Sequence, residues 1–218
     1  SMNSDARAYC EAKTLESAMH SELWSFHDTT DKYKVFPTEF LKGQVDDEER
    51  HTEMLRRVLE LEGFPAERSE DLSMQKVIYQ RVLGLDLNNT RQDENLFHAV
   101  HTMVERRANW IYKMYLLNGT NERFKKVIKL IVKDERRHIS GHRDQLVQND
   151  PKITALFELD DWFFREYYPA HYGTDSLQVN PVFWEDYFSP KGLITDPATV
   201  RPMNDIIPGP LRKPEALV

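Results

Sequence analysis

The sequence predicts an all-α protein: a bundle of four long helices with one long crossover, then a fifth helix and an extended, proline-rich C-terminal arm. Three observations support this fold class. Apolar residues recur three and four positions apart along four long segments, which is the pattern of a helix that buries one face. Alternation of apolar and polar residues, the pattern of a half-buried strand, is missing from the sequence. Eight of the eleven prolines lie between Pro169 and Pro214, and proline interrupts helices.

Glycine, proline and capping residues divide the chain into the expected helices. Pro37 suits the first turn of a helix, and the pair Gly63 and Pro65 ends one. Boundaries of this kind predict long helices over 36–61, 92–117 and 121–147 after a first over 5–33, a short helix over 69–83, and a fifth over 151–168. The face of the first helix that we expect to be buried carries Leu15, Met19, Phe26 and Tyr33. The long connection joins the second long helix to the third, which makes it the crossover of the bundle.

We expect the chain to form two parts. Residues 2–168 form the helical bundle, with Ser1 set aside as an expression remnant before Met2. Residues 169–218 contain too many prolines to be mostly helical. They also carry aromatic residues that a disordered segment rarely has, namely Phe183, Trp184, Tyr187 and Phe188. We therefore expect an extended arm that packs on its own bundle or on a neighbouring subunit, as it would in a homodimer.

Composition and charge narrow the setting and the partners. Cys10 is the only cysteine, which excludes both an intrachain disulfide and a thiolate metal cluster. The sequence contains no apolar run of about 18 residues, so we expect a soluble, cytoplasmic protein without a membrane partner. The formal charge of −7 argues, though weakly, against nucleic acid as a partner.

Charged residues interrupt the expected apolar face of two long helices at the same spacing. Glu48 and His51 stand three positions apart on the second long helix, inside a stripe of leucines and valines. Glu135 and His138 do the same on the fourth, inside a stripe of isoleucines. Buried charges are costly unless they are paired. A carboxylate and an imidazole one turn apart can chelate a cation, and two facing pairs can hold two cations.

Such a site also needs carboxylates from the other two long helices. Glu105 meets this need on the third helix: it lies at the edge of the apolar face, and its interval to Glu135 suits antiparallel helices joined by a short loop. The first helix offers Glu16 and Glu22. Glu22 lies inside the apolar stripe, and its height along the helix fits if the helix reaches Tyr33; Glu16 lies to one side and fits if the helix ends two turns earlier. We prefer Glu22 and keep Glu16 as the alternative.

The other polar residues of these helices have simpler interpretations. His101 and His142 lie within a turn of proposed ligands, and each is either an extra ligand or a hydrogen-bond partner of one. Solvated faces with local ion pairs account for Glu39, Glu49, Glu53, Asp134 and the arginine pairs 56–57, 106–107 and 136–137. Surface or hydrogen-bonded core positions account for His20, His27, His98 and His171. The core accounts for Trp24, Trp110 and the tyrosines of the third long helix.

Together these residues resemble the ferritin-like di-iron carboxylate superfamily, in which two helices each give one Glu and two others each give Glu-x-x-His. The resemblance covers residues 8–147. More narrowly, V-E-x-x-A-x-x-x-Y at Val104 to Tyr112 and V-K-D-E-x-x-H at Val132 to His138 are similar to segments of bacterial aldehyde-deformylating oxygenases. The sequence of the second helix and the proline-rich arm differ from theirs, so the resemblance supports the superfamily and not that substrate.

The resemblance implies an O2-dependent non-haem di-iron oxygenase or oxidase. It implies two Fe ions, or a Mn/Fe pair that the ligand types suit equally, held by Glu22, Glu48, His51, Glu105, Glu135 and His138. It further implies that ferrous ions activate O2 to oxidise a small organic substrate inside the bundle, with an electron donor as a further partner. Two positions differ from particular classes within the superfamily and argue against them. Leu55 stands where radical-generating ribonucleotide reductase subunits keep a tyrosine, and Asn109 stands where bacterial hydroxylases often keep a threonine. A single cysteine is too few for the cysteine-ligated iron module that rubrerythrins usually carry.

Three other functions compete with this one. The superfamily also contains ferroxidases and iron-storage proteins that form closed shells, but these usually end soon after the fourth helix or a short fifth one, and a long aromatic arm fits a shell poorly. A hydroxylase acting on tRNA also occurs on this scaffold, and the acidic charge argues against it only mildly. A purely structural bundle would have to acquire two Glu-x-x-His pairs on its buried face by chance.

Overall fold

The computed structural model describes residues 4–73, 75–76, 80, 86, 91–147 and 149–162. The helices in this part of the chain are α1 (Ser4–Val35), α2 (Glu39–Leu61), α4 (Glu94–Asn118), α5 (Glu122–Asp144) and α6 (Pro151–Trp162), with a 3₁₀ turn η1 (Glu70–Leu72) after α2. No strand occurs among these described residues. The prediction of an all-α protein is therefore confirmed for them.

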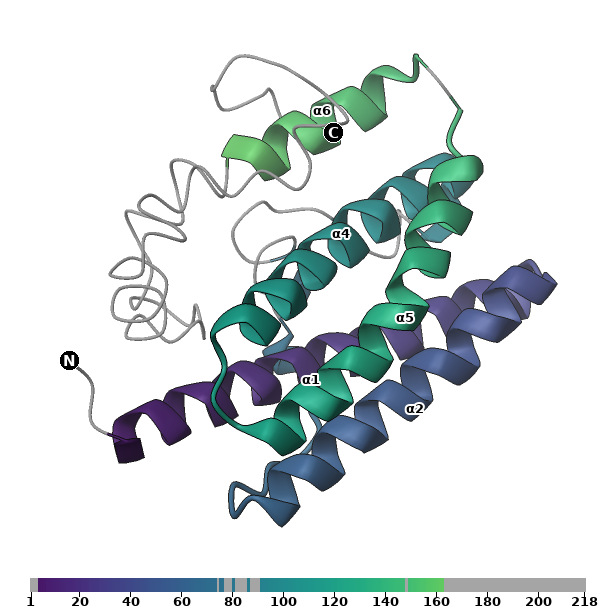
Figure 1. Cartoon of the computed structure of the whole chain (residues 1–218). Coiled ribbons are helices and arrows are strands. Elements are labelled where there is room, and N and C mark those ends of the chain that lie inside the picture. Colours follow the sequence, from purple (N-terminus) through teal and green to yellow (C-terminus); the bar gives the residue numbers. More distant parts are fainter. Residues whose placement is uncertain are drawn as a thin grey trace.

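The four long helices form two antiparallel pairs. Figure 1 shows α1 beside α2 and α4 beside α5. Residues 36–38 join the first pair and residues 119–121 the second. α2 also packs against α5, and α6 packs against α4. The long connection, residues 62–93, falls between α2 and α4, as the sequence predicted.

Side-chain caps fix where three of these helices begin. The hydroxyl of Thr38 accepts a hydrogen bond from the Leu41 amide at the start of α2 (3.2 Å). The side chains of Asp93 and Asn121 do the same for α4 and α5. Each bond satisfies an amide that the first helical turn leaves without a partner. After α2 the chain turns at Gly63, whose φ of 84° lies in the left-handed region that glycine tolerates best.

The core is divided along the bundle axis. On one side the buried positions are apolar and include Leu15, Met19, Leu55, Leu59, Tyr115, Phe124, Ile128 and Ile131. On the other side many are polar and include Asp28, Thr29, Lys32, Gln44, His98, His101 and His142. The change falls where α1, α2, α4 and α5 place Glu22, Glu48, Glu105 and Glu135. A layer of buried acids therefore separates a hydrophobic half of the core from a hydrogen-bonded half.

Two details of the predicted buried face of α1 are wrong. Phe26 and Tyr33 are only half-buried, whereas Lys32 is 2% exposed. The ammonium of Lys32 donates to the carbonyl of Arg91 and lies over the rings of Phe36 and Phe97. An acceptor and two aromatic faces stabilise the buried cation, and an apolar stripe alone does not reveal them.

Several predictions lie outside the described residues. Only the start of the short helix expected over 69–83 is described, where η1 lies. The fifth helix is described to Trp162, and the arm expected over 169–218 and His171 are not described, nor is the Trp110 side chain. None of the described helices combines the length and the low polarity that crossing a membrane requires.

Candidate metal centre

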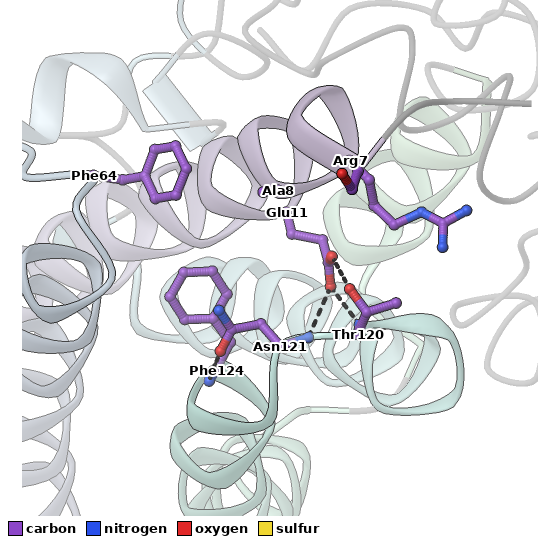
Figure 2. A pocket seen from close by; sticks show the side chains of 8 residues that line it. Arg7, Ala8, Glu11, Phe64, Thr120, Asn121 and Phe124 are labelled. Atoms are coloured by element: carbon purple, nitrogen blue, oxygen red, sulfur yellow. Dashed lines mark hydrogen bonds between the residues drawn. The ribbon is translucent and has the colours of Figure 1, made fainter.

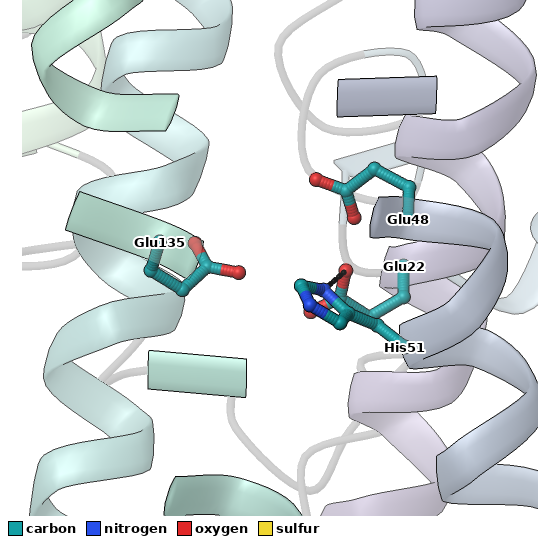
Figure 3. A group of neighbouring side chains, drawn as sticks. All are labelled: Glu22, Glu48, His51 and Glu135. Atoms are coloured by element: carbon teal, nitrogen blue, oxygen red, sulfur yellow. Dashed lines mark hydrogen bonds and ion pairs between the residues drawn. The ribbon is translucent and has the colours of Figure 1, made fainter. Parts of the chain in front are cut away.

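The six side chains predicted as ligands converge in the middle of the bundle. One group consists of Glu22, Glu48, His51 and Glu135, and a second of Glu48, Glu105, Glu135 and His138. In each group, one ligand atom per residue lies within 4.8 Å of all the others, and all six residues are buried. Figure 3 shows the first group, with Glu48 and His51 on α2 facing Glu135 on α5. Two adjacent cations could therefore be held, one in each group.

The structure separates Glu22 from Glu16, the two candidates on α1. Glu22 is 4% exposed and belongs to the first group. Glu16 instead binds the ammonium of Lys13 at 2.8 Å and lies 3.6 Å from the imidazole of His20. Glu16 is therefore outside both groups, as its position beside the apolar stripe indicated.

Glu48 and Glu135 belong to both groups, and their carboxylates are the least satisfied in the described part of the protein. None of their four buried carboxylate oxygens makes a hydrogen bond with the described residues, although Nδ1 of His138 lies 3.1 Å from Glu48 Oε1. An unsatisfied buried polar atom costs about 1–3 kcal/mol, and more when it is charged. A pair of cations between the helices would supply the missing partners. The residues present therefore fit a two-metal centre that would share these two glutamates.

The charge of the site leads to the same conclusion. Burial, followed by repulsion from Glu22 and Glu105, raises the pKa of Glu48 well above its ordinary value. Burial, followed by the charge of Glu105, does the same for the pKa of Glu135. Four clustered carboxylates cannot all ionise without compensating charge. Two divalent cations would neutralise all four.

The two histidines are oriented alike, by carboxylates on the opposite helix. His51 directs Nδ1 toward the first group, 3.4 Å from Glu22 Oε2, and binds Asp134 through Nε2 at 2.8 Å. His138 directs Nδ1 toward Glu48 (3.1 Å) and binds Asp47 through Nε2 at 2.9 Å. A carboxylate on the outer nitrogen fixes the orientation of the ring and directs the inner nitrogen toward the ligand group.

Two arginines complete this outer network. Arg50 donates to Asp47 at 3.1 Å and to Asp134 at 2.6 Å, and Arg137 binds the same two aspartates. Burial opposes ionisation, but the hydrogen bonds from His138 and Arg137 outweigh it and lower the pKa of Asp47 to about 2. Asp47 is thus held as an anion against His138.

The sequence-based interpretation missed this network. It assigned Asp134 and the arginine pairs to solvated faces, which is wrong for Asp134, and it did not single out Asp47. Arg137 is exposed and pairs locally with Asp134, as predicted, but it also binds Asp47 on α2. A signal was present: an aspartate directly precedes the glutamate in both motifs, at 47–51 and at 134–138. Residues one position outside a buried stripe can still reach the neighbouring helix.

The terminal carboxylates each have one further donor. The hydroxyl of Tyr112 on α4 donates to Glu22 Oε1 at 2.7 Å, and Gln44 Nε2 on α2 donates to Glu105 Oε1 at 3.1 Å. The sequence-based interpretation placed Tyr112 in the core and gave Gln44 no role. These two donors orient the glutamates that belong to one group only.

The remaining histidines lie outside both groups. His101 binds Asp28 at 2.7 Å, and His142 binds Gln44 at 2.6 Å, so His142 reaches Glu105 only through Gln44. His98 is buried against His142, and His20 is buried and accepts from the Ser69 amide. The prediction of hydrogen-bonded core histidines is confirmed for these two. His27 is exposed and pairs with Glu70.

A separate pocket of about 560 Å³ lies at the apolar end of the bundle (Figure 2). Glu11 lines it and ties α1 to the α4–α5 turn, accepting hydrogen bonds from Thr120 and from the Tyr115 hydroxyl. Glu11 precedes Glu22 by three helical turns, about 16 Å at 1.5 Å per residue. None of the six ligand candidates lines this pocket.

The donor set is made of carboxylate oxygens and imidazole nitrogens without sulfur. Such donors suit iron and manganese, among other divalent ions, because anionic oxygens stabilise the higher oxidation states. No family model, curated protein or solved structure matches the chain. Its function is therefore inferred from the geometry of the buried glutamates and histidines.

Proposed function

We propose that this protein is an O2-dependent non-haem di-iron oxidoreductase of the ferritin-like type that oxidises a small organic molecule. The observation that carries the proposal is the pair of buried glutamates, Glu48 and Glu135, shared by two ligand groups and making no hydrogen bond with the described residues. Hydrogen bonds alone do not account for this arrangement, because buried carboxylates normally have partners.

Each residue has a role in this proposal. Glu48 and Glu135, which both ligand groups share, would bind both metals; Glu22 and His51 would complete one metal site, and Glu105 and His138 the other. When bound, two ferrous ions would supply the electrons that O2 requires. The carboxylates would balance the charge, and the aspartate–histidine pairs orient both imidazoles with Nδ1 toward the ligand groups, where metal would replace the Nδ1 proton. A Mn/Fe pair fits the same donors.

The surroundings favour an oxidative reaction on an organic molecule. The apolar half of the core begins beside the site with Met19, Leu55 and Ile131, all buried. Apolar walls exclude water and so protect reactive oxygen species from side reactions. The substrate class we propose is therefore a small organic molecule that approaches from this half. An external electron donor would return the metals to the reduced state between turnovers.

A ferroxidase or iron-storage function uses the same ligands and is the second candidate. The buried, four-carboxylate site favours it as much as it favours an oxygenase, since both bind and oxidise ferrous iron. The two differ in the fate of the ferric iron: a storage protein releases it into a mineral inside a closed shell. Size-exclusion chromatography and iron stoichiometry separate them.

The test loads the protein with two Fe(II) per chain without O2, then adds O2 and measures its uptake. We expect rapid uptake by the parent and none by Glu22→Ala. Glu16→Ala is the matched control, because Glu16 lies on the same helix and was the alternative ligand. Uptake by Glu22→Ala at the parent's rate would overturn the ligand assignment. A parent that binds iron but leaves O2 unconsumed would overturn the oxidoreductase.

A further inference from the structure

Gln44 joins the second ligand group to two buried histidines. The side chain of Gln44 is 1% exposed. Its Nε2 donates to Glu105 Oε1 at 3.1 Å, and its Oε1 lies 2.6 Å from Nε2 of His142. Nδ1 of His142 in turn lies 2.9 Å from Nδ1 of His98. Three hydrogen bonds thus run from α4 through α5 and α2 back to a metal-ligand candidate on α4.

The carboxylate of Glu105 decides where the protons lie in this series of three hydrogen bonds. A carboxylate only accepts hydrogen bonds, so Gln44 must present its NH₂ group to Glu105 and its carbonyl oxygen to His142. Nε2 of His142 must therefore carry a proton. Burial, followed by the charges of His101 and His98, lowers the pKa of His142, which keeps the ring neutral and Nδ1 bare. His98, whose pKa burial lowers to about 4, must then donate from Nδ1. All three bonds point their protons toward Glu105.

The rings of the chain are held in place by aromatic contacts. His142 stacks on His101 with ring centres 4.9 Å apart, and His101 is anchored by Asp28. Phe40 packs edge-on against the ring of His142, with ring centres also 4.9 Å apart. A side chain at Gly141 would overlap the ring of Phe40, so glycine there allows this packing. A ring confined on several sides cannot rotate away from Gln44.

We propose that Gln44 and His142 are positioning residues for Glu105, which hold its carboxylate in the second ligand group and so set the affinity for the second metal ion. The inference rests on the two-metal site of the proposed function. A donor that is itself fixed orients the ligand before metal arrives, and losing such a donor commonly weakens metal binding by about 10–100-fold. The first group contains neither Glu105 nor another hydrogen-bond partner of Gln44 among the described residues, so its metal should keep its affinity.

The test measures binding of Co(II), without O2, by competition with a chelator. Gln44→Met removes the donor at nearly constant volume, and His142→Phe removes both ring nitrogens but keeps the aromatic contacts. We expect the first Co(II) equivalent to bind as in the parent and the second to bind about 10–100-fold more weakly. Thr102→Val is the control, because Thr102 is buried on α4 and its hydroxyl binds, among the described residues, the carbonyl of His98 alone. It should bind both equivalents like the parent.

A second readout reports the hydrogen-bond direction without any metal. Nitrogen NMR of the imidazoles should show His142 as the Nε2–H tautomer and His98 as the Nδ1–H tautomer. The double variant Gln44→Met with His142→Phe should weaken the second equivalent no more than Gln44→Met alone, because both act through one chain. The opposite tautomers, or two fully additive losses, would overturn the proposal.

The outcomes separate this inference from the proposed function. If the parent binds two Co(II) and both variants match it, or lose both equivalents equally, the positioning role is wrong and the two-metal site stands. If the variants lose only the second equivalent while the iron-loaded parent leaves O2 unconsumed, the positioning role stands and the oxidoreductase falls. A parent that binds no Co(II) overturns both.

Discussion

His51 on α2 binds Asp134 on α5, while His138 on α5 binds Asp47 on α2, so each helix supplies the carboxylate that orients the other helix's histidine. The two distances, 2.8 and 2.9 Å, are nearly the same. The Asp-Glu-x-x-His segments of the two helices therefore act as one reciprocal unit. Moving either helix would disturb both ligand groups.

This reciprocal pairing predicts that neutralising an aspartate on one helix weakens metal binding by the histidine on the other helix. Asp134→Asn should lower the affinity of one of the two metal equivalents by about 10–100-fold, since the carboxylate raises the basicity of His51. Metal competition titration measures the loss. Asp46→Asn is the control, because Asp46 is exposed and pairs only with Lys42 (3.3 Å) among the described residues. An Asp134→Asn protein with the parent's affinity would show that this contact does not support the site.

The metal-free protein should lose stability as the pH rises above 6.5. Glu48, Glu135, His51 and His138 all have raised pKa values in the fold. Above the ordinary histidine value of 6.5, the folded state therefore holds protons that the unfolded state has lost, so raising the pH favours unfolding. The lowered pKa values of His98 and His142 offset part of this loss just above pH 6.5, where the unfolded rings are still partly protonated, and stop contributing about one pH unit higher.

Urea denaturation of the metal-free protein at a series of pH values measures how steeply the free energy of unfolding falls as the pH rises. Glu48→Gln should flatten this dependence, because one of the raised groups is gone. Bound metal should reverse the trend, since metal replaces protons on the ligands and binds more tightly as the pH rises. Stability that is constant or that increases above pH 6.5 without metal would contradict the charge balance described for the site.

Replacing a glutamate that both ligand groups share should stabilise the metal-free protein while abolishing metal binding. Glu135→Leu removes a buried carboxyl without a donor among the described residues and fills its place with apolar atoms. We expect a gain of about 1–3 kcal/mol in the free energy of unfolding without metal, measured in urea. With metal present the parent should be more stable than Glu135→Leu, because only the parent gains free energy from binding metal. A loss of stability in metal-free Glu135→Leu would mean that this carboxyl has a partner that supports the fold.

Two helix glycines should respond in opposite ways to alanine. A Cβ at Gly141 would overlap the ring of Phe40, whereas nothing lies within 4 Å of a Cβ at Gly43. Gly141→Ala should therefore cost about 1–3 kcal/mol through overpacking, and Gly43→Ala should gain up to about 1 kcal/mol from helix propensity. Chemical denaturation of both variants measures the difference. Equal effects would show that Phe40 moves aside without cost.

The ligand candidates could be predicted because they break a strong rule. A glutamate and a histidine one turn apart inside an apolar stripe stand out, and their occurrence on two helices set the height at which the other helices had to contribute. Glu22 was preferred over Glu16 on the same basis, and the structure places it in the first group. Periodicity therefore found the residues that point directly at the centre.

The supporting residues could not be found in this way. Asp47 and Asp134 lie beside the buried stripes, and a position at the edge of a helix face is compatible with solvent or with a neighbouring helix. Gln44 lies on the buried face and is uncharged, so it carried no distinctive signal. The pairing of α2 with α5 decides these contacts, and that pairing depends on the whole bundle. Periodicity within one helix does not contain it.

Iron per chain tests the central claim most directly. The protein would be loaded with excess Fe(II) in air, freed of unbound metal, and analysed for iron and for its size in solution. The two ligand groups predict two irons per chain on a small oligomer. Glu48→Ala, with a ligand shared by both groups removed, should retain less than one. No retained iron in the parent would contradict the metal centre itself, and tens of irons per chain on a large shell would replace the oxidoreductase by an iron-storage protein.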